Sequence, residues 1–203
     1  MISTDAVAME DGDLLIGLLR RQPDAFTALV SAYQDRLFTF ALRYLGQREE
    51  AEEALQDAFL NAYRALYRRL PPDRMQNLAL KAWLYKVTLN ACRNRARRHS
   101  PVTDDLTTAG ELASDGADPA LAGERAALRQ ALLGELARLP AHYRAAVILH
   151  FVEGLPYQDV AAVLGLPVGT VKSHVHRGAL LMRPGLADWW RGERSKEVAR
   201  DGS

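Results

Sequence analysis

The most informative polar residues of this 203-residue chain lie together in the stretch TVKSHVHR, near its C-terminal end. Hydroxyl, imidazole, ammonium and guanidinium groups recur there, and such groups donate hydrogen bonds to base edges and phosphates in the major groove of DNA. The candidate residues are Thr170, Lys172, Ser173, His174, His176 and Arg177. The stretch therefore predicts a DNA-contact surface, and an ordinary helix with a solvated basic face is the simpler alternative.

The element that would present these groups is a helix-turn-helix over residues 157–182, which read YQDVAAVLGLPVGTVKSHVHRGALLM. A short helix with apolar Val160 and Leu164 comes first, Gly165 permits a sharp turn, and a second helix begins near Gly169. The run GLPVGTVKS has the residue types of a phosphate-binding loop. Its lysine, however, does not follow the second glycine directly, and no strand precedes it. We therefore favour the helix-turn-helix.

A second basic surface is predicted between Arg64 and His99, where ten Lys or Arg residues against one Asp leave nine positive charges. Residues 100–135 carry seven acidic residues and two arginines, so the net charge of +1 conceals two opposite regions. Concentrated positive charge on one element favours a phosphate backbone as its partner. The run RNRARR alone could also be a solvated helix end that the helix dipole favours.

The arrangement of titratable residues argues against catalysis and metal binding. The five histidines lie on predicted helices or basic surfaces without an orienting carboxylate nearby in the sequence. His174 and His176 are two residues apart and so do not share a helix face, which disfavours a metal pair. Cys92 is the single cysteine, and we expect a packed small residue rather than a redox switch. We therefore expect no enzyme activity, no cofactor and no metal.

The apolar runs of the chain are short. The longest, LLIGLL and AAVILHFV, have 6 and 8 residues, against the roughly 18 that a membrane-spanning helix needs. The N-terminal residues MISTDAVAMEDGD are acidic where a secretory signal would be basic. These features, together with a lone cysteine that favours a reducing compartment, predict a cytoplasmic protein without membrane insertion.

The whole chain is expected to be all-α, because apolar residues recur at spacings of three and four and no long segment alternates with period two. In the first half, Asp24 is predicted to be an N-cap and Gly46 to end a helix. Tyr85 could face the core or the surface, whereas we expect Trp83 in the core. The predicted helices cover residues 14–19, 24–46, 51–70 up to Pro71-Pro72, 76–98, 124–139 up to Pro140, and 144–152.

A change in composition divides the chain into two small helical domains, residues 10–99 and 124–185. Residues 100–123 are rich in Ser, Thr, Asp and Gly and lack an apolar face, which predicts a flexible acidic linker. A tail over residues 186–203 contains Trp189-Trp190, which could cap the second core or engage a partner.

Four stretches in this order resemble one protein family: DAFTALVSAYQDRLFTFALRYLG, AEEALQDAFLNAYRAL, KAWLYKVTLNACRNRARR and LARLPAHYRAAVILHFVEGLPYQDVAAVLGLPVGTVKSHVHR. Together they closely resemble an extracytoplasmic-function (ECF, group 4) sigma factor of the sigma-70 family, over residues 10–183. The resemblance implies that the first domain is sigma region 2 and the second sigma region 4. It further implies binding to core RNA polymerase, recognition of -10 and -35 promoter elements, and control by an anti-sigma factor.

The same resemblance implies a role for individual residues. The stretch AEEALQDAF matches the helix that docks on the β′ clamp helices, which implies core-polymerase contacts for Glu53, Gln56 and Asp57. Contacts with the -10 element are implied for Arg68, Arg69, Asn77, Lys81, Lys86, Asn90, Arg93 and Arg97. The TVKSHVHR residues named above fall on the helix that meets the -35 duplex beside the β flap.

Two departures from the family pattern VKSRLHRARRRLR bear on the -35 contact. His174 stands where an arginine is usual, and residues 178–181 are apolar where a basic run would be. Fewer phosphate contacts are therefore expected. TVKSHVHR alone also resembles a LuxR-type regulator, so a free-standing transcriptional regulator is the alternative. Such a protein would need a sensing domain, often α/β, where residues 10–99 are predicted to be all-helical.

Overall fold

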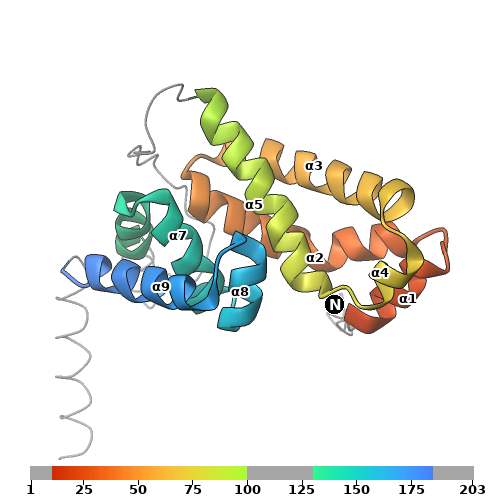
Figure 1. Cartoon of the computed structure of the whole chain (residues 1–203). Coiled ribbons are helices and arrows are strands. Elements are labelled where there is room, and N and C mark those ends of the chain that lie inside the picture. The colour runs from red at the N-terminus through yellow and green to blue at the C-terminus, as the bar shows by residue number, and fades with distance from the viewer. Residues whose placement is uncertain (1–10, 100–129, 185–203) are drawn as a thin grey trace, which may run out of the picture.

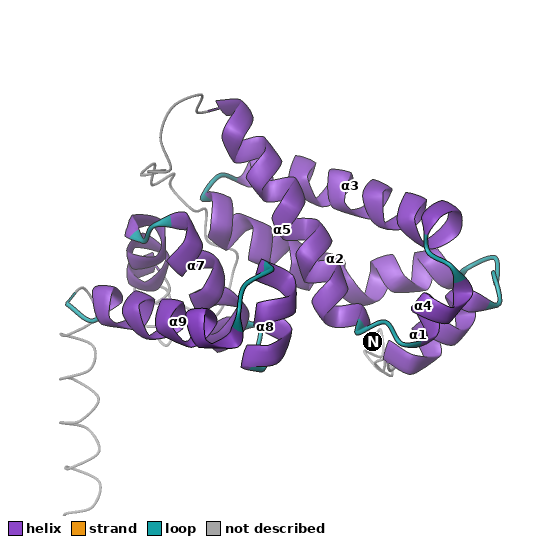
Figure 2. Cartoon of the chain, in the orientation of Figure 1, coloured by secondary structure: helices purple, strands orange, loops and turns teal. Residues whose placement is uncertain are grey.

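The computed structural model describes residues 11–99 and 130–184, and all regular structure in these two ranges is helical (Figure 2). The predicted all-α class with two helical domains is confirmed. The predicted linker, residues 100–123, and the Trp189-Trp190 tail lie outside the described residues, so the predicted domain bounds stay predictions. No helix in the described ranges is long and apolar enough to span a bilayer.

Residues 11–99 form what we call the first body. Helices α2, α3 and α5 pack on one another, and α1 packs on α2 and α4 (Figure 1). The elements are α1 (Asp11–Leu19), α2 (Ala25–Leu45), α3 (Arg48–Arg64), the π-helical turn η1 (Ala65–Arg69), α4 (Pro72–Gln76) and α5 (Leu80–His99).

Glycine and proline set the helix ends of the first body. Gly46 ends α2 in the left-handed conformation, at φ 78°, and its N–H donates to the Leu42 carbonyl at 2.8 Å, as a helix stop should. Asp24 precedes α2 as predicted, but its side chain makes no capping hydrogen bond. The helix predicted to end before Pro71 does so, through α3 and then η1.

The helix predicted over 76–98 is wrong at its start. Pro72 opens a separate short helix, α4, because a first helical position does not need the N–H that proline lacks. The Leu78 N–H then donates to the Met75 carbonyl at 3.1 Å, which closes α4 in a turn. As a result α5 begins only at Leu80.

Residues 130–184 form what we call the second body. Residues 130–138 are helical, and Pro140 separates this helix from the next one, as predicted. Gly165, at φ 68°, makes the turn between the last two helices, the second of which begins at Val168, just before the predicted start. The named elements are α7 (Ala141–Val147), the π-helical turn η2 (Ile148–Val152), α8 (Tyr157–Leu164) and α9 (Val168–Met182).

Close packing of α7 on α9 holds the helix-turn-helix in place. Gly178 of α9 is buried against α7, and a Cβ built there would lie 2.5 Å from Cγ2 of Val147. Val171 and Val175 are buried on the same side of α9. The opposite side of α9 is therefore the one left for a partner.

The two bodies lie against each other, with α8 beside α5 and α7 beside α2 (Figure 1). Tyr85 of α5, which could have faced either way, is fully buried, and Trp83 is half-buried. The contact between the bodies thus covers part of the basic helix α5.

Candidate nucleic-acid interface

Helix α9 presents most of its predicted DNA-contact residues outward. Lys172, Ser173, His176 and Arg177 are exposed, and Thr170 is half-buried. The ammonium of Lys172 lies 5.7 Å from the ring centroid of Tyr157 in α8, a cation–π contact that orients the side chain. The Ser173 hydroxyl donates to the Gly169 carbonyl at 3.1 Å. The helix-turn-helix therefore offers two long cations and an imidazole to a groove.

His174 is placed differently from its neighbours. Its ring packs edge-on against His142 and Tyr143 of α7, with centroids 5.1 and 5.2 Å away. Its Nδ1 atom is buried without a hydrogen-bond partner. Burial, assisted by nearby His142 and Arg177, lowers the pKa of His174 below its usual value. The structure thus sets this ring between α9 and α7, and its DNA contact stays a prediction.

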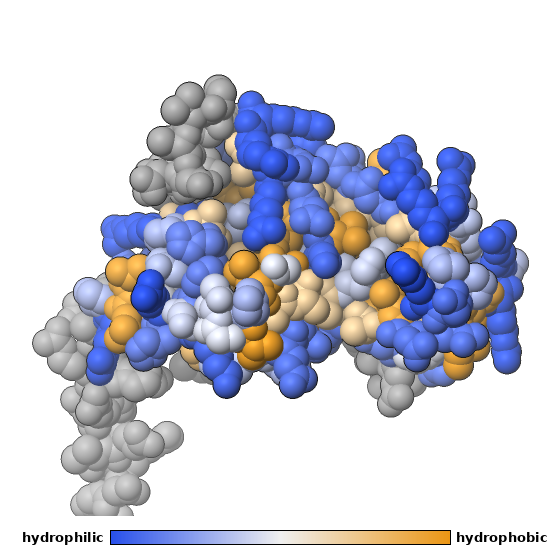
Figure 3. Space-filling view, in the orientation of Figure 1, coloured by the Kyte–Doolittle hydropathy of each residue, from blue (hydrophilic) through white to orange (hydrophobic). Residues whose placement is uncertain are grey.

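The residues predicted for the -10 element follow α5 and the segment before it. Arg68 and Arg69 lie on η1 and Asn77 just after α4, all three exposed. Hydrophilic side chains cover the C-terminal end of α5 (Figure 3). Along α5, Lys86, Asn90 and Arg97 are exposed and Lys81 and Arg93 half-buried.

The residues predicted to contact the polymerase lie on α3. Glu53 and Gln56 are exposed and Asp57 is half-buried. Three carboxylates of this helix converge on one guanidinium of α5. Arg95 donates to Glu50 at 2.9 Å, to Asp57 at 3.3 Å and to Glu53. We call Glu50, Glu53 and Asp57 the acidic ridge.

Sequence reasoning counted Arg95 only as one charge of the basic helix. Its partners lie 38 to 45 residues away, so no local spacing could have indicated them.

A second residue that the sequence did not single out, Glu153, joins the two bodies. The Tyr85 hydroxyl donates to its carboxylate, and Arg43 of α2 lies 3.5 Å from the other carboxylate oxygen. Lys81, one of the predicted -10 residues, donates to the Glu153 carbonyl at 3.0 Å. Burial and the carboxylate raise the pKa of Tyr85 far above its usual value, so its hydroxyl stays a donor.

Arg144 of α7 makes a further polar contact between the bodies. Its buried guanidinium donates to the Tyr44 carbonyl of α2 at 2.7 Å. Within its own body it donates to the carbonyls of Leu139, at 3.0 Å, and Ala137. Tyr44 lies in the last turn of α2, where carbonyls lack helical partners and the dipole favours a cation.

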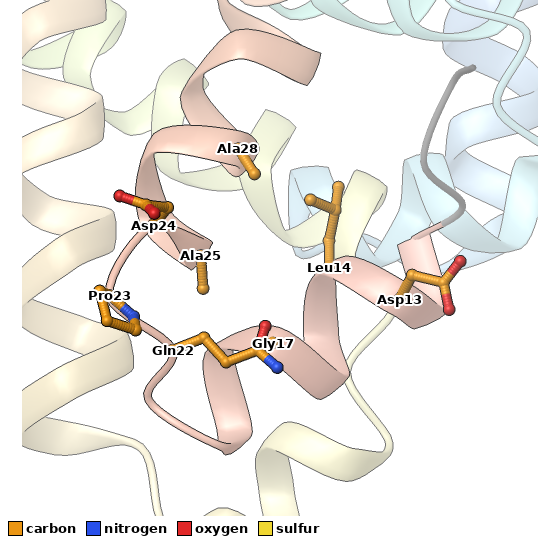
Figure 4. Close-up of a pocket in the computed structure, with 8 residues that line it drawn as sticks. All are labelled: Asp13, Leu14, Gly17, Gln22, Pro23, Asp24, Ala25 and Ala28. Atoms are coloured by element: carbon orange, nitrogen blue, oxygen red, sulfur yellow. The ribbon is translucent and has the colours of Figure 1, made fainter. Parts of the chain in front are cut away.

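A pocket in the described ranges offers no converging chemical groups, and these ranges hold no metal-binding cluster. A pocket of about 300 Å³ lies where α1 turns into α2. The carboxylates of Asp13 and Asp24 at its rim point away from each other (Figure 4). Residues 11–99 and 130–184 hold no group of three or more His, Cys, Asp or Glu side chains that could bind a metal.

Comparison with known proteins assigns both bodies to described sequence families. Residues 29–102 match the model of sigma-70 region 2, and residues 129–182 match that of sigma-70 region 4. The ECF RNA polymerase sigma factor SigW of Bacillus subtilis is 30% identical over 175 residues, 81% of this chain and 90% of that protein. The RNA polymerase sigma-H factor of Pseudomonas aeruginosa is 33% identical over 178 residues, 83% of this chain and 89% of that one.

Two solved structures share the fold at 23% identity. CnrH in complex with the cytosolic domain of CnrY matches with a TM-score of 0.64, over 88% of this chain and 97% of that one. The sigma factor RpoE in complex with the anti-sigma factor NepR from Bartonella quintana matches with a TM-score of 0.62, over 81% of this chain and 98% of that one.

Proposed function

This chain belongs to the extracytoplasmic-function group of the sigma-70 family of RNA polymerase sigma factors, and we propose how its two bodies divide the work of promoter recognition. Glu53, Gln56 and Asp57 of the first body bind the β′ clamp helices of core polymerase. Helix α5 and the segment before it meet the -10 element, and α9 meets the -35 duplex beside the β flap. The protein acts in the cytoplasm as a transcription factor and not as an enzyme.

One observation carries this proposal: two separate bodies of the chain each present a basic helix, and the first also presents a row of carboxylates. Lys172 and Arg177 project from α9, and Lys86 and Arg97 from α5. The cations of α5 and those of α9 can each neutralise the phosphates of a nearby stretch of DNA backbone. Two such sites on one chain therefore suit two separate elements of one promoter. Carboxylates on α3 suit a basic protein partner and would repel DNA. A free-standing regulator that binds only DNA would not need the carboxylates of α3.

The packing of the two bodies implies a movement. Lys81 is engaged by Glu153, and α8 lies beside α5, where the -10 strand would pass. Lys81 and the covered part of α5 become available to DNA only when the bodies separate. We therefore propose that the arrangement seen here is a resting state and that core polymerase binds the separated one.

An anti-sigma factor is the proposed regulator. Both solved structures of similar fold contain a second protein, the cytosolic domain of CnrY in one and the anti-sigma factor NepR in the other. A protein that holds the two bodies together would keep Lys81 and its neighbours on α5 from DNA. The resting arrangement supplies the surface on which such a regulator acts.

Run-off transcription with purified core polymerase and a library of genomic promoter fragments tests the proposal. Transcript starts that appear only with this protein, and that share two spaced upstream elements, are the expected result. Binding to duplex DNA as a dimer without polymerase, and no protein-dependent starts, would favour the free-standing regulator instead.

A further inference from the structure

We propose that Arg95 is a positioning residue for polymerase binding: it holds the acidic ridge of α3 in the conformation that docks on the core enzyme. The proposal rests on the proposed function of the ridge. It reverses what the sequence suggests for Arg95, which stands between the predicted DNA contacts Arg93 and Arg97 in a run of basic residues.

The geometry makes Arg95 a clamp on the inner side of the ridge. Its side chain is only 11% exposed, whereas the side chains of Glu53 and Asp57 are 57% and 45% exposed. The guanidinium therefore reaches the carboxylates from the α5 side and leaves those of Glu53 and Asp57 accessible from solvent, whereas the Glu50 side chain is 19% exposed. Nε and Nη1 serve Glu50 and Asp57, and Nη2 serves Glu53. The planar guanidinium offers five N–H donors in a fixed fork that spreads over the three carboxylates, whereas lysine offers three donors from a single nitrogen on a flexible stem.

The spacing of the ridge explains why it needs such a clamp. Positions 50, 53 and 57 follow each other at intervals of three and four, so their carboxylates are neighbours on one face of α3. Like charges at these intervals repel and drive side chains apart. Arg95 offsets that repulsion and fixes rotamers that would otherwise have to be ordered during binding. The ridge thus meets its partner already arranged.

Two effects of Arg95 on polymerase binding have opposite signs, and this makes the proposal testable. If only the net charge of the ridge mattered, loss of the Arg95 charge would make the ridge more acidic and strengthen its attraction to a basic partner. If positioning matters more, the same loss weakens binding. We expect positioning to dominate, because the fixed carboxylates contact the partner directly, whereas steering acts mainly on the association rate.

The experiment titrates full-length protein, fluorescently labelled at its N-terminus, against core polymerase without DNA. Arg95→Gln should weaken binding about tenfold, equivalent to about 1.4 kcal/mol, through faster dissociation, and Arg95→Lys should recover only part of the loss. Arg98→Gln removes an equal charge from an exposed position on the same helix, and its affinity should stay within about twofold of wild type. Thermal unfolding followed by circular dichroism establishes that each variant is folded at the assay temperature.

Two results would overturn the proposal. Folded Arg95→Gln protein that binds core polymerase as tightly as wild type, or more tightly, shows that Arg95 does not position the ridge. The double variant Glu53→Gln/Asp57→Asn tests the proposed function separately, because it removes two carboxylates and keeps Arg95. If that variant binds normally, the ridge is not the polymerase contact. If it binds poorly while Arg95→Gln binds well, only the positioning role fails.

Discussion

Removing the charge of Glu153 should loosen the contact between the two bodies. The carboxylate is 9% exposed, accepts a hydrogen bond from Tyr85 and pairs with Arg43 at 3.5 Å. Glu153→Gln keeps the size and leaves a neutral acceptor for Tyr85. A hydrogen bond to a charged group is worth about 1.5–3 kcal/mol and a neutral one about 0.5–1.5 kcal/mol. The ion pair, with Arg43 29% exposed, adds at most about 1 kcal/mol.

Together these terms cost the resting arrangement about 2 kcal/mol, or about 30-fold in the ratio of separated to packed molecules. Pulsed electron–electron double resonance measures that ratio through the distribution of distances between two spin labels. The labels are attached at Ser31→Cys in α2 and Ala162→Cys in α8. Both positions are exposed, and the native Cys92 is fully buried, so it competes poorly for the label. In the variant, a larger fraction of the molecules than in wild type should lack the short distance.

Glu52→Gln is the matched control, because Glu52 pairs with Arg48 within α3, at an exposed site away from the contact between the bodies. It should leave the distance distribution unchanged. If folded Glu153→Gln protein shows the same ratio of separated to packed molecules as wild type, the charge of Glu153 does not hold the bodies together. The resting state would then depend on Arg144 and apolar packing.

Three further predictions concern stability and reactivity. Because the folded state lowers the pKa of His174, the unfolded chain binds the proton more tightly, so the second body should lose stability as pH falls below about 6.5. His174→Gln should flatten this dependence in thermal melts. Gly178→Ala should cost about 1–3 kcal/mol in urea unfolding, since the new Cβ overpacks the contact between α7 and α9. Burial raises the pKa of Cys92 to about 12, so its thiol should react with an aromatic disulfide reagent only after unfolding.

Each of these predictions has its own control. His176→Gln changes an exposed histidine on the same helix, and the pH dependence of stability should survive it. Gly134→Ala adds a Cβ with no atom within 4 Å in a helical segment, where alanine is favoured over glycine by about 1 kcal/mol. Equal effects of Gly178→Ala and Gly134→Ala would contradict the packing argument, and rapid modification of native Cys92 would contradict its burial.

Local chemistry explains why much of the fold could be predicted from the sequence. Gly46 and Gly165 end their helices because the left-handed conformation suits glycine. Pro71 and Pro140 break their helices because each lacks an N–H. The start of α5 was missed, since a short proline-led helix followed by a turn has the same apolar spacing as a longer helix.

The contacts that assemble the site depend on packing between distant segments, which periodicity does not encode. The contacts of Arg95 and Glu153 could not be predicted, because the residues that they bind lie tens of positions away in the chain. Tyr85 could not be assigned to core or surface for the same reason: its hydroxyl is paired with Glu153, which the second body supplies. The outward placement of Lys172 and Arg177, by contrast, followed from the helix period alone.

The contact of Arg144 with a main-chain carbonyl has a consequence for chimaeras between members of this family. Every residue type has a carbonyl, so the Tyr44 position can change identity without removing the acceptor. A second body that keeps this arginine should therefore dock on a first body from a different relative. The Glu153 contacts require a matching hydroxyl and a matching cation on the other side. Exchange of domains should thus retain the Arg144 contact. It should lose the Glu153 contacts unless the new first body also carries the hydroxyl of Tyr85 and the cation of Arg43.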